Sequence, residues 1–231
     1  MNTLYNRTRT AKRAFLLLIL CLLSWAFSVT LIACKRTVDF TSLVSEYRNN
    51  LFVYEEQDLS VKAHNLEREY PYVADGYKSE MNCRVEIFVS ATAEVNCCEI
   101  YFFASGFQHG GEASYDGVKR QFYFSCAADV ADASSLQVRI RLDETEKELT
   151  LRSVKTPDLL PLSELLNRLF STESELQKKL TENGELACEL YVRILYEDAP
   201  YFYVGVVDRK GTIHAFLLHG KTGEILAKRT T

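Results

Sequence analysis

The stretch LQVRIRLDETEKELTLR, residues 136–152, decides the fold class of most of the chain. Apolar and polar residues alternate along Leu136–Leu142, and the alternation returns in Leu149–Arg152 after a charged turn. A period of two residues is typical of a β-strand with one buried face and one solvent-facing face. Two such segments joined by a short polar turn predict an antiparallel hairpin.

The same period extends over about residues 59–154, with further strands expected near Val85–Val89, Glu99–Ala104 and Lys119–Cys126. Before them, apolar residues recur at helical spacing in Asp39–Leu51, which predicts an opening helix capped by Asp39. The prediction for residues 34–155 is therefore an antiparallel β-rich domain, a sandwich or curled sheet with one packed helix.

Beyond Thr156-Pro157 and Pro161 the pattern becomes helical, in LSELLNRLF (162–170) and STESELQKKLTENG (171–184). Four extended segments follow, and glycine-containing turns separate the later ones. The expected strands are Glu185–Tyr196, Tyr201–Asp208, Thr212–His219 and Glu224–Lys228. Residues 156–231 are thus predicted to form a helix-plus-antiparallel-meander domain, which makes the whole chain α+β.

Residues 1–33 are set apart as a targeting or anchoring segment. Four basic residues precede Ala14–Ala33, a run without any charge that ends one residue before Cys34. Leu31–Cys34 resembles the lipobox of bacterial lipoproteins, which implies a cleaved signal peptide and a lipidated Cys34. The run is also long enough for an uncleaved transmembrane anchor. In both cases the basic residues favour a cytoplasmic start and place the domains on the extracytoplasmic side of the cell membrane.

The charge balance argues against nucleic acid as a partner. The chain has 27 Lys and Arg against 31 Asp and Glu, and residues 1–33 contribute four basic residues and no acidic one. The remainder has 23 basic and 31 acidic residues, a formal net charge of −8. Without a basic stripe such a surface does not attract phosphate backbones or anionic lipid, so the membrane is reached through the N-terminal anchor.

The C-terminal part contains two segments, Tyr203–Asp208 and Lys221–Leu226, that resemble the PepSY-type modules of exported bacterial proteins. The similarity covers roughly residues 160–229, with His219 at a position where that family commonly has an aspartate. The whole chain resembles uncharacterised secreted or lipid-anchored proteins of Gram-positive bacteria. The PepSY resemblance implies a role in modulating an envelope protease or another envelope enzyme.

Cysteine and histidine patterns give no catalytic motif. Five cysteines follow Cys34, and an odd number cannot pair fully within one chain. If one disulfide forms, Cys83 or Cys126 is expected to pair with Cys97 or Cys98, because neighbouring strands carry them. Cys188 with His214 or His219 is a candidate thiol–imidazole pair, although a packed strand cysteine is the preferred interpretation. No metal site or cofactor is predicted.

Two further groups of residues are candidates for a site. His109 is expected on a loop tip where Phe107 and Tyr115, with Phe103 nearby, line a binding surface, since loops often carry function. Glu67, Glu69 and Asp75 place three carboxylates close together, and two carboxylates at a controlled separation are the apparatus of glycoside hydrolysis. An ordinary turn and a solvated strand are the alternatives for the two groups.

The sequence thus favours a membrane-tethered extracytoplasmic binding protein without enzymatic activity, whose partner is an envelope protein, a peptide or a wall component. The alternative is a hydrolase acting on wall glycan or peptide through the acidic group. A third possibility is an anchored structural scaffold.

Overall fold

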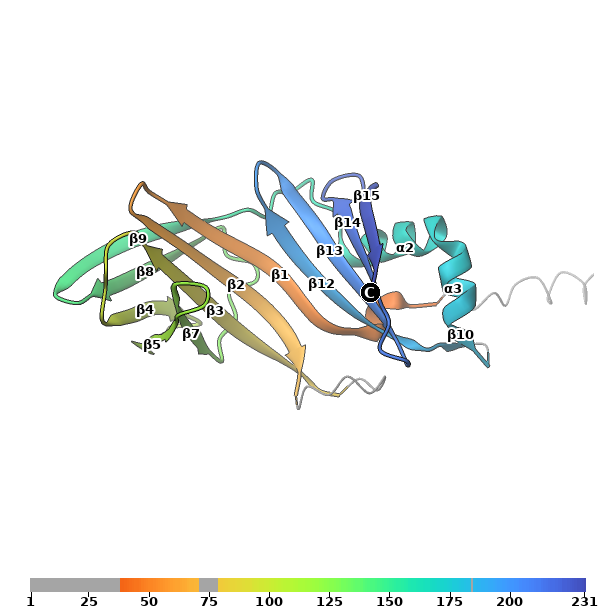
Figure 1. Cartoon of the computed structure of the whole chain (residues 1–231), viewed down its shortest axis with the longest axis horizontal. Helices are drawn as coiled ribbons and strands as arrows, with labels where there is room; N and C mark the ends of the chain where they lie inside the picture. Colours follow the sequence, from red (N-terminus) through yellow and green to blue (C-terminus); the bar gives the residue numbers. More distant parts are fainter. Residues whose placement is uncertain (1–37, 71–78, 184) are drawn as a thin grey trace, which may run out of the picture. The chain divides into compact units, whose positions relative to one another are not determined.

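The computed structural model describes residues 38–70, 79–183 and 185–231, and Asp39–Thr231 forms one compact unit (Figure 1). The predicted leader with Cys34 and the predicted carboxylate Asp75 lie outside the described residues. The coarse prediction of a β-rich α+β fold with mostly antiparallel strands is confirmed. Most strands belong to one thirteen-stranded sheet, and a two-stranded sheet pairs β10 (Thr181–Glu182) with β11 (Glu185–Leu186).

The first nine strands curl into a nearly closed sheet in the order β5-β4-β8-β9-β1-β2-β3-β7-β6. At the seam, a Cβ added to Gly111 of β5 would stand 3.7 Å from the Phe124 ring of β7. The strand bounds are β1 (Val44–Glu55), β2 (Leu59–Glu69), β3 (Met81–Ala91), β4 (Cys98–Ala104), β5 (Phe107–Glu112), β6 (Ser114–Asp116), β7 (Gln121–Cys126), β8 (Ser135–Leu142) and β9 (Thr145–Ser153).

The hairpin predicted from residues 136–152 is confirmed as β8 and β9, which pair from Leu142 opposite Thr145 to Ser135 opposite Arg152. The alternation also assigns the faces correctly. Leu136, Val138 and Ile140 are buried and Leu142 is partly buried, whereas Gln137, Arg139 and Arg141 are exposed.

The C-terminal part follows the predicted order of elements. Helices α2 (Leu162–Thr172) and α3 (Ser174–Leu180) precede an antiparallel meander of four strands. These strands are β12 (Cys188–Tyr196), β13 (Pro200–Asp208), β14 (Ile213–His219) and β15 (Ile225–Thr230). Gly211 and Gly223 have positive φ in the connecting turns, which explains glycine at both positions.

The predicted opening helix is wrong. Residues Phe40–Leu43 form only a 3-10 turn (η1), capped by the Asp39 side chain, and β1 starts at Val44. Two bulges explain the misleading spacing: one lies between Val44 and Glu46 and the other between Arg48 and Asn50. Each bulge adds a residue to the strand, so Val44 and Tyr47 pack into the same cluster although they are three residues apart.

Strand β1 connects two hydrophobic clusters. One fills the curled sheet and includes Phe52, Ile87 and Ile140. The other lies between α2 and strands β12–β14, and it also contains Phe40 of η1 with Val44 and Leu51 of β1. The predicted boundary after residue 155 falls in the connection between β9 and α2, while the sheet itself continues through the pairing of β1 with β12.

That pairing is the one parallel contact among the described strands, and charged side chains hold it together. Glu46 of β1 is only 2% exposed. Its carboxylate accepts hydrogen bonds from Arg48 Nε at 3.0 Å, Arg193 Nε of β12 at 2.8 Å and Arg68 Nε of β2 at 2.7 Å. A buried carboxylate is expensive unless it is paired in this way.

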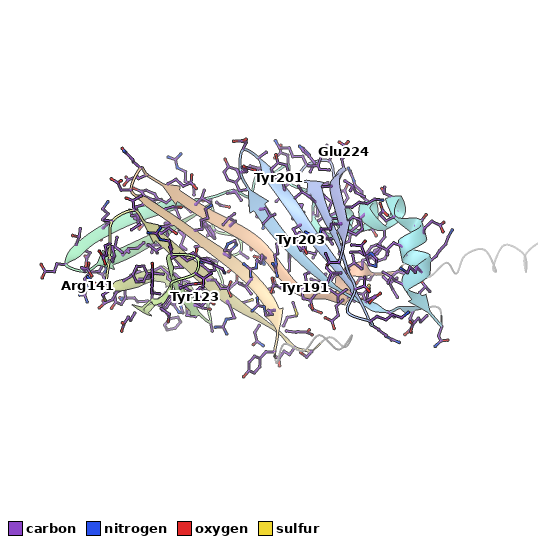
Figure 2. The ribbon with its side chains drawn as sticks, viewed as in Figure 1. Tyr123, Arg141, Tyr191, Tyr201, Tyr203 and Glu224 are labelled. Atoms are coloured by element: carbon purple, nitrogen blue, oxygen red, sulfur yellow. The ribbon has the colours of Figure 1, made fainter. Side chains whose placement is uncertain are left out.

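The contacts continue to both sides of Glu46. The Arg193 guanidinium lies 5.8 Å from the ring centre of Tyr203 on β13, which Figure 2 labels. On the other side Arg48 Nη2 is 3.6 Å from Glu86 of β3, and the Tyr123 hydroxyl of β7 donates to Glu86 Oε1 at 3.1 Å. We call Glu46 and the three arginines that bind its carboxylate the Glu46 cluster; the arginines are Arg48, Arg68 and Arg193.

His64 of β2 lies beside the Glu46 cluster, with its ring edge-on to Phe88 at 5.7 Å between centroids. Burial, together with the positive charges of Arg48 and Lys62, lowers the pKa of His64 to about 4. The imidazole is therefore neutral at pH 7. Its Nδ1 is buried without a hydrogen-bond partner among the described residues.

We expect Glu46→Gln to lower the free energy of unfolding by about 3 kcal/mol, because Arg68 and Arg193 lose their counter-charge and Arg48 keeps only the longer contact to Glu86. Burial raises the pKa of Glu46, but Arg193, Arg48 and Arg68 outweigh it and hold that pKa below its ordinary value. The stabilisation is therefore present at neutral pH and is lost as the pH falls through the folded-state pKa.

Urea denaturation at pH 7 measures the change in the free energy of unfolding that Glu46→Gln causes. Glu175→Gln, at an exposed helical pair, is the control and should shift stability by less than about 0.5 kcal/mol; equal effects of the two variants would contradict the assignment.

We also expect stability to fall between pH 6.5 and pH 4 because of His64. The unfolded chain takes up a proton on this side chain below about pH 6.5, whereas the folded chain does so only near pH 4. The loss amounts to about 3 kcal/mol across this window. His64→Gln should flatten the curve of unfolding free energy against pH in this range. An unchanged slope in the variant would show that His64 is not the group responsible.

Candidate functional site

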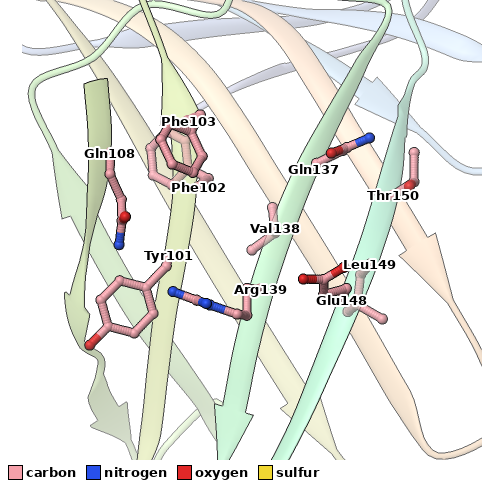
Figure 3. Close-up of a pocket in the computed structure, with 10 residues that line it drawn as sticks. All are labelled: Tyr101, Phe102, Phe103, Gln108, Gln137, Val138, Arg139, Glu148, Leu149 and Thr150. Atoms are coloured by element: carbon pink, nitrogen blue, oxygen red, sulfur yellow. The ribbon is translucent and has the colours of Figure 1, made fainter. Parts of the chain in front are cut away.

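The best-defined candidate site is a groove on the outward face of β5, β4, β8 and β9, shown in Figure 3. It has a volume of about 440 Å³, which is within the range of small-ligand sites. We call it the outer groove. Its lining residues are Tyr101, Phe102, Phe103, Gln108, Gln137, Val138, Arg139, Glu148, Leu149 and Thr150.

Strand register arranges the groove in two rows. In the first, the neutral row, Phe103 of β4 lies opposite Gln108 of β5, and Gln137 of β8 lies opposite Thr150 of β9. The pairing of Phe102 with Val138 brings the two halves of this row together. In the second, the charged row, Tyr101 is opposite both Gly110 of β5 and Arg139 of β8, and Arg139 is opposite Glu148 of β9.

Phe103 is the most unusual side chain of the neutral row because it is 69% exposed although it lies within β4, one residue before that strand ends. Its neighbour Phe102 is 2% exposed and belongs to the core. No hydrogen bond within the described residues occupies the side chains of Gln108, Gln137 or Thr150. The row therefore presents an aromatic ring between unused donors and acceptors.

In the charged row, Tyr101 is held in place from several sides. Its ring lies 5.3 Å from the Arg139 guanidinium carbon, a contact that Figure 3 shows. The Tyr101 hydroxyl donates to Glu99 Oε2 at 2.9 Å, and this hydrogen bond raises the pKa of Tyr101. Arg141 also binds Glu99. The phenol is thus a protonated, fixed wall of the groove.

Gly110 makes room for that wall. A Cβ at this position would stand 2.3 Å from the Ile100 carbonyl oxygen and 2.4 Å from Tyr101 Cδ1. Only a residue without a side chain permits the ring to lie across β5 here, an arrangement in which an aromatic side chain covers a glycine on the neighbouring strand.

The residues predicted as a binding loop lie on strands. Phe107 and His109 belong to β5, and Tyr115 belongs to β6. The His109 ring is half-buried and stacks on Phe102 with centroids 5.4 Å apart, and Tyr115 packs on Phe122 at 5.0 Å. Phe107 is 70% exposed where β5 leaves its turn. None of the three lines the outer groove, although β5 contributes Gln108 to it.

The acidic group does not form part of the groove either. The Asn49 amide donates to Glu67 Oε1 at 3.0 Å, and the Ser79 backbone N–H donates to Glu69 Oε2 at 2.9 Å. Glu67 lies opposite Tyr47, where burial and the carboxylate raise the pKa of Tyr47 to about 12. Because Asp75 is not among the described residues, the hydrolase alternative stays a prediction.

The cysteines of the described part are separate thiols. All five are free, so no disulfide forms between Cys83 or Cys126 and Cys97 or Cys98. Strand β4, with Cys98, pairs with β5 and β8 rather than with β3 or β7. Burial, with Glu189 nearby, raises the pKa of Cys188 to about 12. This thiol belongs to the hydrophobic cluster between α2 and strands β12–β14. His214 instead has Thr230 as its neighbour, at 3.2 Å.

Other kinds of site are not found in the part of the chain that the structure describes. No three His, Cys, Asp or Glu side chains there come together as metal ligands. No helix there combines the length and the apolar character needed to cross a membrane.

Comparisons with family models, with characterised proteins and with solved structures find no match to this chain. The interpretation of the site therefore depends on its own geometry. The alternation in β8 and β9 already marked Gln137, Arg139 and Thr150 as outward residues. What the sequence did not reveal is that two aromatic residues of β4 share that face.

Gly110→Ala tests how the groove is built. We expect it to lower the free energy of unfolding by about 2 kcal/mol, because the new methyl group overlaps the Ile100 carbonyl and the Tyr101 ring. Denaturant unfolding gives the stability, and the NMR ring signals of Tyr101 report its displacement. Gly117→Ala is the matched control, since its nearest contact would be an ordinary 3.8 Å. A neutral Gly110 variant would refute the close approach of β4 and β5.

Proposed function

We propose that this chain is a membrane-tethered extracytoplasmic binding protein and that the outer groove is its ligand site. The observation that carries the proposal is Phe103, a large apolar ring exposed between hydrogen-bonding side chains inside a concave surface. Ligand sites typically combine an aromatic surface with a few fixed polar groups.

The rigidity of the strands around the groove supports this role. β4 pairs with β5 and β8, and β8 pairs with β9, which in turn pairs with β1. Four strands joined in this way fix the spacing of the lining side chains before any ligand arrives. A preformed site avoids the entropic cost of ordering loops on binding.

The tether is proposed from residues 1–34, through lipidation of Cys34 or through an uncleaved helix. Both alternatives hold the binding domain at the outer surface of the cell membrane. Along the chain, helices α2 and α3 are followed by the meander β12–β15, which is the order of elements expected of a PepSY-like module. Modulation of an envelope enzyme is therefore the proposed consequence of ligand binding.

The experiment is photo-crosslinking in the native membrane from the rim of the groove. A photoreactive amino acid in place of Gln108 should capture a ligand, and the capture should disappear when Phe103→Ala is added. The matched control carries the same photoreactive group in place of Val118, which is 95% exposed on the turn between β6 and β7. Identical products from both positions, or capture that persists without Phe103, would contradict the assignment of the groove.

The anchor has its own test. We expect Cys34→Ala to abolish incorporation of labelled palmitate and to leave the mature chain with its first 33 residues. The measurements are metabolic labelling and the intact mass of the membrane-extracted protein. If the mass is unchanged and the parent chain incorporates no label, the uncleaved transmembrane anchor is correct instead.

A further inference from the structure

We infer that the outer groove binds a glycan, a chain of uncharged pyranose units with one sugar ring resting on Phe103. This inference rests on the proposed binding function and adds the chemical class of the ligand. It is drawn from the neutral row, which contains one phenyl ring, two primary amides and one hydroxyl.

Phe103 supplies the platform. A pyranose ring has one face made mainly of C–H groups, and such a face packs against the electron-rich face of an aromatic ring. Phe103 has no polar atom of its own to be satisfied and is 69% exposed, so its ring is available for this contact. A ligand that is polar at its edges and apolar on one face matches this surface.

Gln108, Gln137 and Thr150 supply the edges. They stand on β5, β8 and β9, on either side of Phe103. Each amide offers two donors and an acceptor, and a sugar hydroxyl or acetamido group both donates and accepts hydrogen bonds. Adjacent strands are about 4.8 Å apart, so the row from β5 to β9 extends over about 14 Å, the scale of a short oligosaccharide.

The charges of the groove favour an uncharged ligand. Arg139 and Glu148 lie opposite each other in the charged row, so the lining contributes one positive and one negative charge. A strongly anionic or cationic chain would gain attraction from one of them and repulsion from the other. Neutral hydroxyl and acetamido groups can use both as hydrogen-bond partners without that penalty.

A peptide fits less well. Peptides that bind to sheets usually add a strand at an open edge, where the backbone provides the hydrogen bonds. The centre of the groove lies over β4 and β8, whose backbones are already paired on both sides, and among the described strands that line it only β5, at the rim, has an unpaired edge. A second copy of this chain fits less well still, because a stable dimer needs a broad apolar patch rather than a single ring in a polar row.

The test uses the full chain in a zwitterionic detergent without a sugar head group, which would compete for the groove. The probes are chitotetraose and cellotetraose, with isothermal titration calorimetry as the measurement. We expect binding of at least one tetrasaccharide, weakened about tenfold or more by Phe103→Ala and clearly by Gln137→Ala. Tyr115→Ala removes a comparably exposed aromatic ring outside the groove and should leave the affinity unchanged.

Other outcomes would overturn the glycan and separate it from the proposed function. If neither tetrasaccharide binds but crosslinking from position 108 still captures a ligand through Phe103, the binding function stands and the glycan is wrong. If Phe103→Ala instead changes the oligomeric state in analytical ultracentrifugation, the groove is an interface between copies of this chain. If calorimetry detects no binding of either tetrasaccharide and crosslinking from position 108 captures no ligand, the glycan and the proposed function are both wrong.

Discussion

The burial of the Glu46 carboxylate is the constraint on which the rest of this structure depends. A carboxylate that is 2% exposed must be matched by charge, and three arginines from three neighbouring strands do so. Two of them come from β2 and β12, the strands on either side of β1. Because β12 begins more than 130 residues after β1 ends, this is also where distant parts of the chain are fixed in register.

The pairing of β1 with β12 affects the whole sheet because β1 also pairs with β9 and β2. Its first half pairs with β12 and its second half with β9, while β2 runs along its other edge. Residues at the start of β1 therefore complete the cluster under α2, and Phe52 near its end belongs to the core of the curled sheet. The two clusters share one strand, so the Glu46 cluster stabilises the frame that also carries β9 and, through it, the outer groove.

How far the sequence predicts this fold depends on how each strand is buried. Strands with one solvent-exposed face, such as β8 and β9, alternate apolar and polar residues with a period of two. Their pairing and their faces were predicted correctly. β1 is buried along much of its length and interrupted by two bulges, so its apolar residues imitate a helix. The polar residues Glu46, Asn49 and Asn50 are buried there as well, which no pattern of apolar residues can reveal, because most of their partners lie on other strands.

The outer groove depends on a choice of register that the residues of β4 leave open by themselves. Phe102 and Phe103 are adjacent, and a shift of one residue would bury the second and expose the first. That shift would also turn Glu99 and Tyr101 into the apolar core, where an unpaired carboxylate costs several kcal/mol. In the observed register Glu99 instead meets Arg141, and Tyr101 lies across Gly110. The observed register therefore buries Ile100 and Phe102 and keeps Glu99 outside, and the Phe103 ring left on the outer face becomes available to a ligand.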